Sequence, residues 1–252
     1  MAALTACATA LPKPLPPASS AYTPRAEVFW VTIAVNGRRA GFGRGEYTRG
    51  EGAPYQYQNL ILFTHGGYRH AQRDWWEFGG DLRPANFFQK IISWKGGQSV
   101  TNTIDGVFHY DTGKLKVEYN EFNTHENVDV PIPPSPLARF TQNLVLARQK
   151  LSAGRWFRFT VYDSKHRRFA VQTFKVISFD SPQRAWKIEQ TSEENPGAVS
   201  TSWFQSASAA HPNGWVVRSV TPGADRATIE MRAVTRDEAI KGYEKEATSL
   251  GI

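Results

Sequence analysis

The 252-residue chain contains one cysteine, Cys7. A single cysteine cannot form an internal disulfide or a cysteine-based metal site, so both are excluded. No run of about eighteen apolar residues occurs, so we predict no transmembrane helix. The 30 Lys and Arg outnumber the 23 Asp and Glu, giving a net charge of +7, but no long basic run is present. Because helix-turn-helix, zinc-finger and ribonucleoprotein motifs are also absent, we expect no nucleic-acid partner.

The first 24 residues read as a signal remnant and a tether rather than as part of a folded domain. Leu4-Thr5-Ala6-Cys7 resembles the bacterial lipobox, the motif in which a cysteine becomes lipidated after cleavage. The resemblance implies a lipid anchor on Cys7 and a periplasmic protein held at the outer membrane. Residues 8–24 are rich in Pro, Ala and Ser, and such a segment prefers extended conformations to a packed core.

Alternation of apolar and polar side chains predicts β-strands through most of the remaining chain. The first strand runs from Glu27 to the dipeptide Asn36-Gly37, which is typical of two-residue hairpin turns. Residues 38–48 form the expected return strand, in which glycines at 41, 43 and 45 predict a bulge or a strong bend. Further strands are expected at 57–64, 68–78, 87–94, 98–110, 114–122, 155–163, 166–179, 185–191, 199–205, 215–221 and 227–234.

Two helices are expected among these strands. Ser135-Pro136 suits a helix start, and apolar residues at 137, 140, 144, 145 and 151 recur at helical spacing before Gly154. The capping box Thr235-Arg236-Asp237-Glu238 predicts a second helix over residues 239–250. Four prolines in residues 130–136 predict a connector between two halves, 25–130 and 137–252, of a single β domain. The predicted fold is mainly β: a large curved antiparallel sheet, as a half-barrel or open barrel, with one central and one C-terminal helix.

Motifs for catalysis or metal binding are weak. Residues 125–129 have the ligand spacing of a helical metal motif, but their extended, Pro-bounded context provides no helix face. His65, His70 and Asp74 flank the Gly66-Gly67 turn, where they either meet across a hairpin or, as we favour, form polar positions on its solvent face. No Gly-x-Ser-x-Gly nucleophile motif is present. We therefore predict no catalytic residue, no metal site and no cofactor.

The aromatic residues, 13% of the chain, suggest two alternative roles. On a curved sheet they either pack a core or line a pocket for an apolar ligand. Bulky apolar groups occupy both faces of some strands, as at Phe29-Trp30-Val31 and Trp75-Trp76, and this motivates the ligand hypothesis. The candidate ligand-binding residues are Trp30, Phe42, Trp75, Trp94, Trp156 and Trp203.

The order of strands and turns resembles that of bacterial envelope proteins with the open β half-barrel of LolA and LolB, including related families of unknown function. The resemblance is carried by residues 31–43, by Ser152-Ala153-Gly154 before an aromatic strand, and by the late hairpin at 197–218. It implies a non-enzymatic protein that binds a lipid or another hydrophobic ligand. Two alternatives stay open: a structural or assembly protein of the envelope that binds a protein or glycan partner, and a pocket enzyme such as a cyclase or hydrolase.

Overall fold

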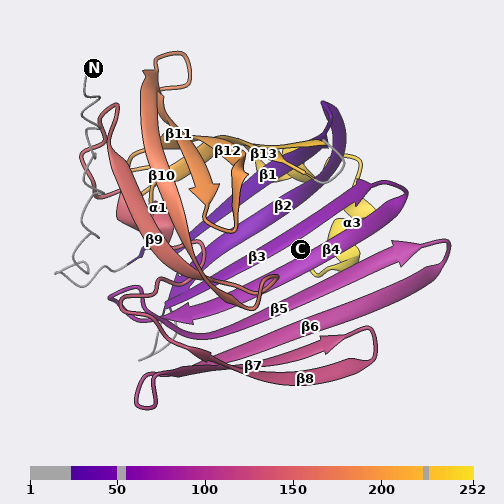
Figure 1. Ribbon diagram of the computed structural model, residues 1–252. Helices are drawn as coiled ribbons and strands as arrows, with labels where there is room; N and C mark the ends of the chain where they lie inside the picture. The colour runs from indigo at the N-terminus through magenta and orange to yellow at the C-terminus, as the bar shows by residue number, and fades with distance from the viewer. Residues whose placement is uncertain (1–23, 50–54, 224–226) are drawn as a thin grey trace, which may run out of the picture.

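The structure is a computed structural model that describes residues 24–49, 55–223 and 227–252. Fourteen strands form one curved sheet in which all neighbouring strands are antiparallel (Figure 1). This confirms the predicted mainly β fold. In chain order the strands are β1 (Glu27–Val35), β2 (Arg38–Arg49), β3 (Tyr55–His65), β4 (Tyr68–Phe78), β5 (Pro84–Lys95), β6 (Gln98–His109), β7 (Lys114–Glu121), β8 (Thr124–Pro131), β9 (Trp156–Asp163), β10 (Arg168–Asp180), β11 (Ala185–Ser192), β12 (Asn195–Gln205), β13 (Trp215–Pro222) and β14 (Thr228–Val234).

The sheet ends at β8 on one side and at β9 on the other. Strands β1 to β8 follow one another in space, and β14 to β9 continue from the other side of β1. Because β1 pairs with both β2 and β14, strands from both halves of the chain belong to one sheet. Strand β8 is absent from the sequence-based prediction. Residues 124–127 are all exposed in the structure, so their sequence has no alternation of apolar and polar side chains that would predict a strand. The connector therefore begins after Pro131 and not at Val130.

The central helix is much shorter than predicted. Only α1 (Gln142–Leu146) is helical, and Ser135 and Phe140 have φ angles of 53° and 73°. Such left-handed backbone cannot belong to a right-handed helix. Leu137 forms instead a parallel bridge with Val161, at the outer edge of β9. The helical spacing of apolar residues in this segment reflects burial of an irregular chain.

The C-terminal helix is divided in two. Thr235 caps α2 (Arg236–Ile240), with its hydroxyl accepting the backbone N–H of Glu238 at 3.4 Å, so the helix start predicted from the capping box is confirmed. The predicted continuous helix over 239–250 is wrong, because Gly242 has a φ of 81° and α3 (Glu244–Ser249) begins after it. None of the helices in the described ranges is long and apolar enough to cross a membrane.

Strand β2 bends near its start, as its glycines predict. Ile33 pairs with Gly41, whereas the next residue of β1 pairs with Arg39. Ala40 is therefore an extra residue in β2, which makes a β-bulge. Beyond the bulge, Gly43 and Gly45 face the same side as Tyr47, which is part of the core on the concave face.

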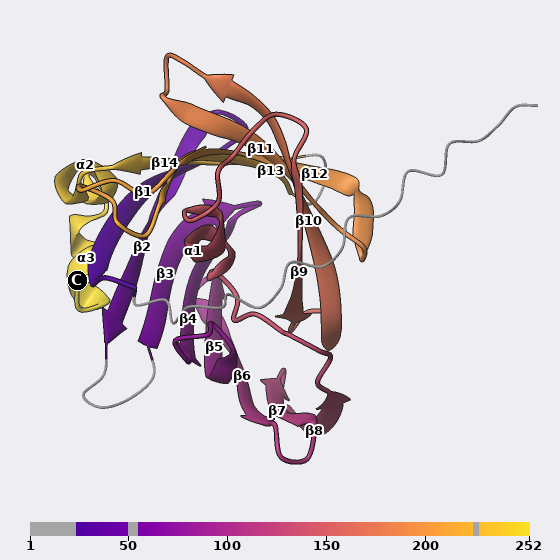
Figure 2. The same cartoon turned by 90° about the vertical axis from the view of Figure 1, so that its left-hand side faces the viewer.

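The segment 132–155 packs inside the curve of the sheet, where Figure 2 shows α1 surrounded by strands. Leu144 is fully buried among side chains from β2 to β9, while Leu146 is buried among side chains from β9 to β12. The short helix thus joins both arms of the sheet and fills one end of its interior, which we call the filled end. The first cluster comprises Tyr47, Tyr57, Trp76, Phe78, Leu82, Phe87, Ile104, Phe108, Leu115, Val117, Tyr119, Val130, Ala138, Leu144 and Tyr162.

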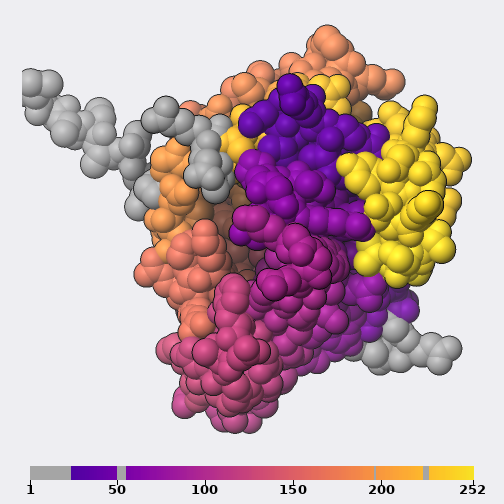
Figure 3. Space-filling view, turned by 90° about the vertical axis from the view of Figure 1, so that its right-hand side faces the viewer, coloured from indigo at the N-terminus to yellow at the C-terminus, as the bar shows by residue number. Residues whose placement is uncertain are grey.

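The two C-terminal helices cover part of the outer, convex face. Ala239 of α2 and Ala247 of α3 are buried against Phe42, Leu62 and Ala71. In Figure 3 these helices, in yellow, lie against strands of the first half. Small side chains on the helices allow them to approach the sheet closely.

Side chains bridge the two edges of the sheet, and we call this bridge the clasp. The hydroxyls of Tyr119 in β7 and Tyr162 in β9 are 2.5 Å apart, and burial raises the pKa of both. Arg167, in the turn after β9, forms an ion pair with Glu121 at 3.3 Å and another with Glu126 of β8. The sheet is therefore barrel-like, although β8 and β9 share no ladder of backbone hydrogen bonds within the described strands.

Candidate functional site

The concave face has an open end opposite the filled end, at the tips of the β1–β2 and β3–β4 hairpins. One cross-strand row there consists of Ile91, Gln72, Ile61, Gly43 and Val31, each paired with the next on the neighbouring strand. Gly43 is buried, the side chains of the other four residues are half-buried, and none of the five belongs to a buried cluster. Apolar side chains that nothing covers completely are the defining feature of this surface.

A second row lies one step nearer the hairpin tips, about 7 Å along the strands. It continues across β1 into the second arm of the sheet, where Met231 of β14 pairs with Ile33 of β1 and with Ser219 of β13. Figure 3 shows the molecule hollowed at this end, between the orange strands of the second arm and the purple strands of the first. We call this space the hollow. The second row comprises Ser93, His70, Phe63, Gly41, Ile33, Met231, Ser219, Ser202 and Ile188.

A hydrogen-bonded polar layer separates the hollow from the filled end, and we call it the polar floor. Asp74 is 1% exposed, and its carboxylate accepts amide hydrogen bonds from Gln89 at 2.6 Å and Gln72 at 2.8 Å. Asn59 donates a third at 3.4 Å. The amide oxygen of Gln89 accepts the hydroxyl of Ser164, which lies beyond β9, at 3.1 Å. The carboxylate therefore has three neutral donors, and no cation forms an ion pair with it within the described residues.

The predicted position of Asp74 on the solvent face of its hairpin is wrong, because it lies in this floor. His70 occupies the same face four residues before it, which is about 13 Å along an extended strand. Partial burial, followed by the nearby His65, lowers the pKa of His70, whose Nδ1 lies 2.9 Å from the hydroxyl of Ser93. The histidines and the carboxylate therefore do not meet across the hairpin.

The second arm presents amides and hydroxyls to the interior. The side-chain oxygen of Gln172 accepts hydrogen bonds from Gln142 of α1 at 3.3 Å and from Gln190 at 3.2 Å. Ser202 and Ser219 are half-buried in the neighbouring part of the same face. The interior of the second arm thus carries polar groups beside the buried apolar side chains of β10 to β12.

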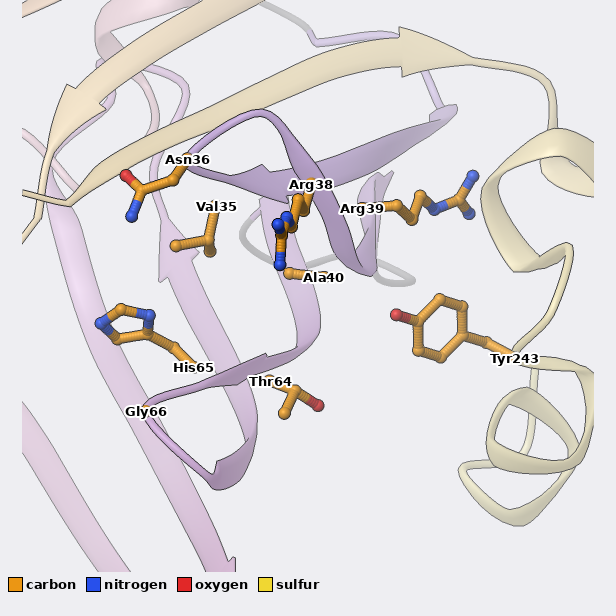
Figure 4. A pocket seen from close by; sticks show the side chains of 9 residues that line it. All are labelled: Val35, Asn36, Arg38, Arg39, Ala40, Thr64, His65, Gly66 and Tyr243. Atoms are coloured by element: carbon orange, nitrogen blue, oxygen red, sulfur yellow. The ribbon is translucent and has the colours of Figure 1, made fainter.

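A pocket of about 640 Å³ lies at the rim of the hollow, between the tips of the first two hairpins and the C-terminal helices (Figure 4). Val35 and Arg38 form the last pair of the β1–β2 ladder, and His65 pairs with Tyr68 beside the next turn. Tyr243, between α2 and α3, closes the opposite side. The lining residues are Val35, Asn36, Arg38, Arg39, Ala40, Thr64, His65, Gly66 and Tyr243.

Three of the six predicted ligand-binding residues lie on the convex face, beside the C-terminal helices. Phe42 is fully buried there, and its ring centroid lies 5.8 Å from that of Tyr243. Trp30 and Trp94 are half-buried against the same cluster. The guanidinium carbons of Arg44 and of Arg236 each lie within 6 Å of the Trp30 ring. These aromatics attach the helices to the sheet.

The other three predicted residues are dispersed. Trp75 faces the convex side, opposite the buried Trp76. Trp156, at the edge strand β9, is 47% exposed. Trp203 donates its indole N–H to Asp180 at 2.9 Å on the convex face of β12. The structure thus does not gather the six aromatics in one interior, and ligand binding by any of them stays a prediction.

The remaining sequence expectations have different outcomes. Cys7 and the tether up to residue 23 lie outside the described residues, so the lipid anchor stays a prediction. Residues 125–129 are extended in β8, as expected. No cluster of His, Cys, Asp or Glu within the described ranges has a geometry that would hold a metal ion.

Sequence reading missed the residues that line the hollow. Ile61 and Ile91 look like ordinary strand positions, and Gln72 looks like an exposed polar residue. Only the register of β3, β4 and β5 brings them into one row. The glycines of β2 were a usable signal, since side chains of β1 cover them: Val31 lies over Gly43 and Phe29 over Gly45.

The fold is similar to a crystal structure described as a beta-barrel-like protein of domain of unknown function DUF1849 from Brucella abortus. The TM-score is 0.55 at 12% sequence identity, over 83% of this chain and 95% of that chain. At this identity the likeness shows a shared beta-barrel-like fold, and a fold by itself does not specify function. No family model and no curated protein matches the sequence. The resemblance to LolA and LolB stays a prediction.

Proposed function

We propose that this protein is a non-enzymatic binding protein of the bacterial envelope that holds a lipid or another hydrophobic ligand in the hollow. The observation that carries the proposal is the row of half-buried apolar side chains at Ile91, Ile61 and Val31. At the filled end of the concave face, apolar side chains are sealed by α1 and its flanking chain. Each methylene group that a ligand buries here contributes about 0.8 kcal/mol, so an acyl chain has a sufficient driving force.

The polar floor supports the same proposal. Its hydrogen bonds from Asn59, Gln72 and Gln89 to Asp74 occupy the carboxylate, so the base of the hollow is already satisfied without a ligand. A buried network with all its partners is rigid, and this limits how deeply a chain enters. An apolar ligand would lie along the wall of β1, β3 and β5 and end at this floor.

A pocket enzyme has less support. Acid–base catalysis needs groups within hydrogen-bond reach of one reacting centre. His70 and Asp74 are separated by about 13 Å along β4. Their immediate partners, Ser93 and three amides, are fixed by hydrogen bonds.

A structural or assembly role has one specific observation in its favour, the outer edge of β8. Among the described strands, β8 pairs only with β7, and residues 124–127 are exposed. A free edge can add a strand from a partner. The ion pair between Glu126 and Arg167 covers part of this edge, so we rank the role second.

The binding proposal is tested with N-phenylnaphthylamine, a neutral probe that fluoresces in apolar sites. Wild-type protein should bind it, and the double variant Ile61→Gln/Ile91→Gln should bind about tenfold more weakly, because polar amides replace the apolar wall. Val107→Gln, on the exposed convex face of β6, is the matched control and should bind as the wild type does. Melting temperatures of all variants show whether each is folded.

The envelope part of the proposal needs a separate test. In a bacterial host that processes lipoproteins, labelled palmitate should be incorporated into the protein and lost in Cys7→Ser. Native mass spectrometry of the membrane-extracted protein should also detect a second lipid that organic solvent releases. Wild-type protein that binds no neutral probe and releases no lipid would refute ligand binding; protein without palmitate would refute the anchor alone.

A further inference from the structure

Arg38 and Arg39 are neighbours in sequence but have different roles, because successive residues of a strand point to opposite faces. Arg39 donates hydrogen bonds to the backbone oxygens of Glu238 and Ala239, at 3.0 and 2.5 Å, and thereby holds α2 against the sheet. Arg38 lines the rim pocket and makes no hydrogen bond or ion pair with any described residue. Its charge is therefore available to a ligand.

The rest of the pocket lining adds hydrogen-bond donors and no acid. Figure 4 shows the phenol of Tyr243 directed from the helix side toward the pocket, with Thr64 and His65 on the opposite side. Asn36 has its side-chain oxygen occupied by the backbone N–H of Thr228 at 2.8 Å, so its NH₂ group remains as a donor. No Asp or Glu belongs to the lining within the described residues. The lining thus has two guanidinium groups, of which that of Arg39 is hydrogen-bonded to α2, together with neutral donors and no carboxylate. Such a lining suits an anionic oxygen group.

The rim pocket lies next to the hollow along two strands. Val35 lines the pocket and follows Ile33 on the same face of β1, while His65 lines it and follows Phe63 on the same face of β3. From His65 to Ile61 the strand spans about 13 Å, which is the length of a medium-sized alkyl chain. The buried carboxylate of the polar floor lies at the far end of this path and would repel an anion there.

We infer that the rim pocket binds the phosphate or carboxylate head group of an amphiphile whose alkyl chain lies in the hollow. Arg38 provides the charge, and Tyr243 and Thr64 provide neutral donors. The positive rim and the negative floor fix the direction of the ligand, with its head group outward. This inference rests on the proposed function, since the tail occupies the same apolar wall.

The test compares three probes by titration calorimetry below the critical micelle concentration: dodecyl phosphate, dodecanol and inorganic phosphate. Wild-type protein should bind dodecyl phosphate about tenfold more tightly than dodecanol, as expected for a charge-assisted hydrogen bond. Arg38→Gln should remove this preference and leave dodecanol binding unchanged. Lys116→Gln removes the same charge from an exposed position in β7 and should retain the preference.

The outcomes separate this inference from the proposal on which it rests. Equal binding of dodecyl phosphate and dodecanol, unaffected by Arg38→Gln, would overturn the head-group site and leave the hydrophobic site intact. Binding of inorganic phosphate alone would make the pocket a site for free anions and overturn the inference. Absence of binding to dodecyl phosphate and dodecanol alike would refute both the head-group site and the proposed function.

Discussion

Replacing Leu144 by alanine tests whether the segment between β8 and β9 is an integral part of the core. Leu144 is fully buried on α1, within the cluster that fills one end of the sheet. The cavity would not collapse easily, because the segment is attached on both sides of α1. The N–H of Leu137 donates to Thr160 at 2.9 Å, and the N–H of Gly154 donates to Val176 at 2.8 Å. We therefore expect Leu144→Ala to lower the free energy of unfolding by about 3 to 5 kcal/mol, the upper part of the range for replacing a buried leucine by alanine.

The assay is urea unfolding followed by tryptophan fluorescence and by circular dichroism, with coincident transitions as the test of two-state behaviour. A loss of this size should lower the melting temperature by about 10 °C in a chain of this length. Leu250→Ala is the matched control, since Leu250 is half-buried beside α3 and should cost less than half as much. A loss below about 1 kcal/mol for Leu144→Ala would refute the reasoning, because it would mean that α1 is not anchored in the core.

Three further predictions concern the clasp and the curved strand. Arg167→Ala should lower the free energy of unfolding by about 1 kcal/mol. Because the ion pairs of Arg167 are partly exposed, this loss should shrink in molar salt, and a loss that does not depend on salt would argue against the clasp. Burial raises the folded-state pKa of Tyr162, so the contribution of this tyrosine to the free energy of unfolding is complete below about pH 10 and is lost as the pH rises further. Tyr162→Phe should therefore make the urea midpoint fall less steeply at alkaline pH. Gly45→Ala should cost about 1 to 3 kcal/mol. Its Cβ would lie 2.0 Å from Cζ of Phe29, whereas Gly197→Ala, with no atom within 4 Å, should be neutral in the same thermal scan.

Local signals predicted most strands and turns correctly. The Asn36-Gly37 turn has φ angles of 50° and 75°, values that this dipeptide adopts at little cost. The N-cap hydrogen bond of Thr235 also formed, because it spans only three residues. Such features depend on neighbours in sequence, so they can be recognised without the fold.

The central helix shows where a local signal was misleading. Apolar residues at helical spacing satisfied the pattern, but the chain at Ser135 and Phe140 is left-handed and irregular. The carbonyl of Phe140 accepts the hydroxyl of Tyr47 at 2.9 Å, and its ring stacks on Tyr57. Burial against distant strands, and not helix formation, explains the apolar residues here.

The candidate site was not predictable from the sequence. Alternation along a strand assigns side chains to two faces, but it does not tell which of the two faces the interior. Trp30 and Phe29 are both bulky, yet Phe29 packs toward the concave core and Trp30 lies beside the C-terminal helices. Asp74 looks like a solvent-facing residue until three strands supply its amide donors. Buried polar groups of this kind depend on partners that only the sheet register defines.

The sequence by itself determined the class of this protein: a mainly β chain with many antiparallel strands, short turns, one cysteine and a surplus of positive charge. Tertiary structure decided that β1 pairs with β14 and that side chains of β7 and β8 meet those of β9 and the turn after it. It also decided that one end of the interior is filled while the other is open. The physical reason is the range of the interactions. Turns and alternation act between neighbours, whereas the hollow, the polar floor and the rim pocket are built from strands brought together only by the pairing of the whole sheet.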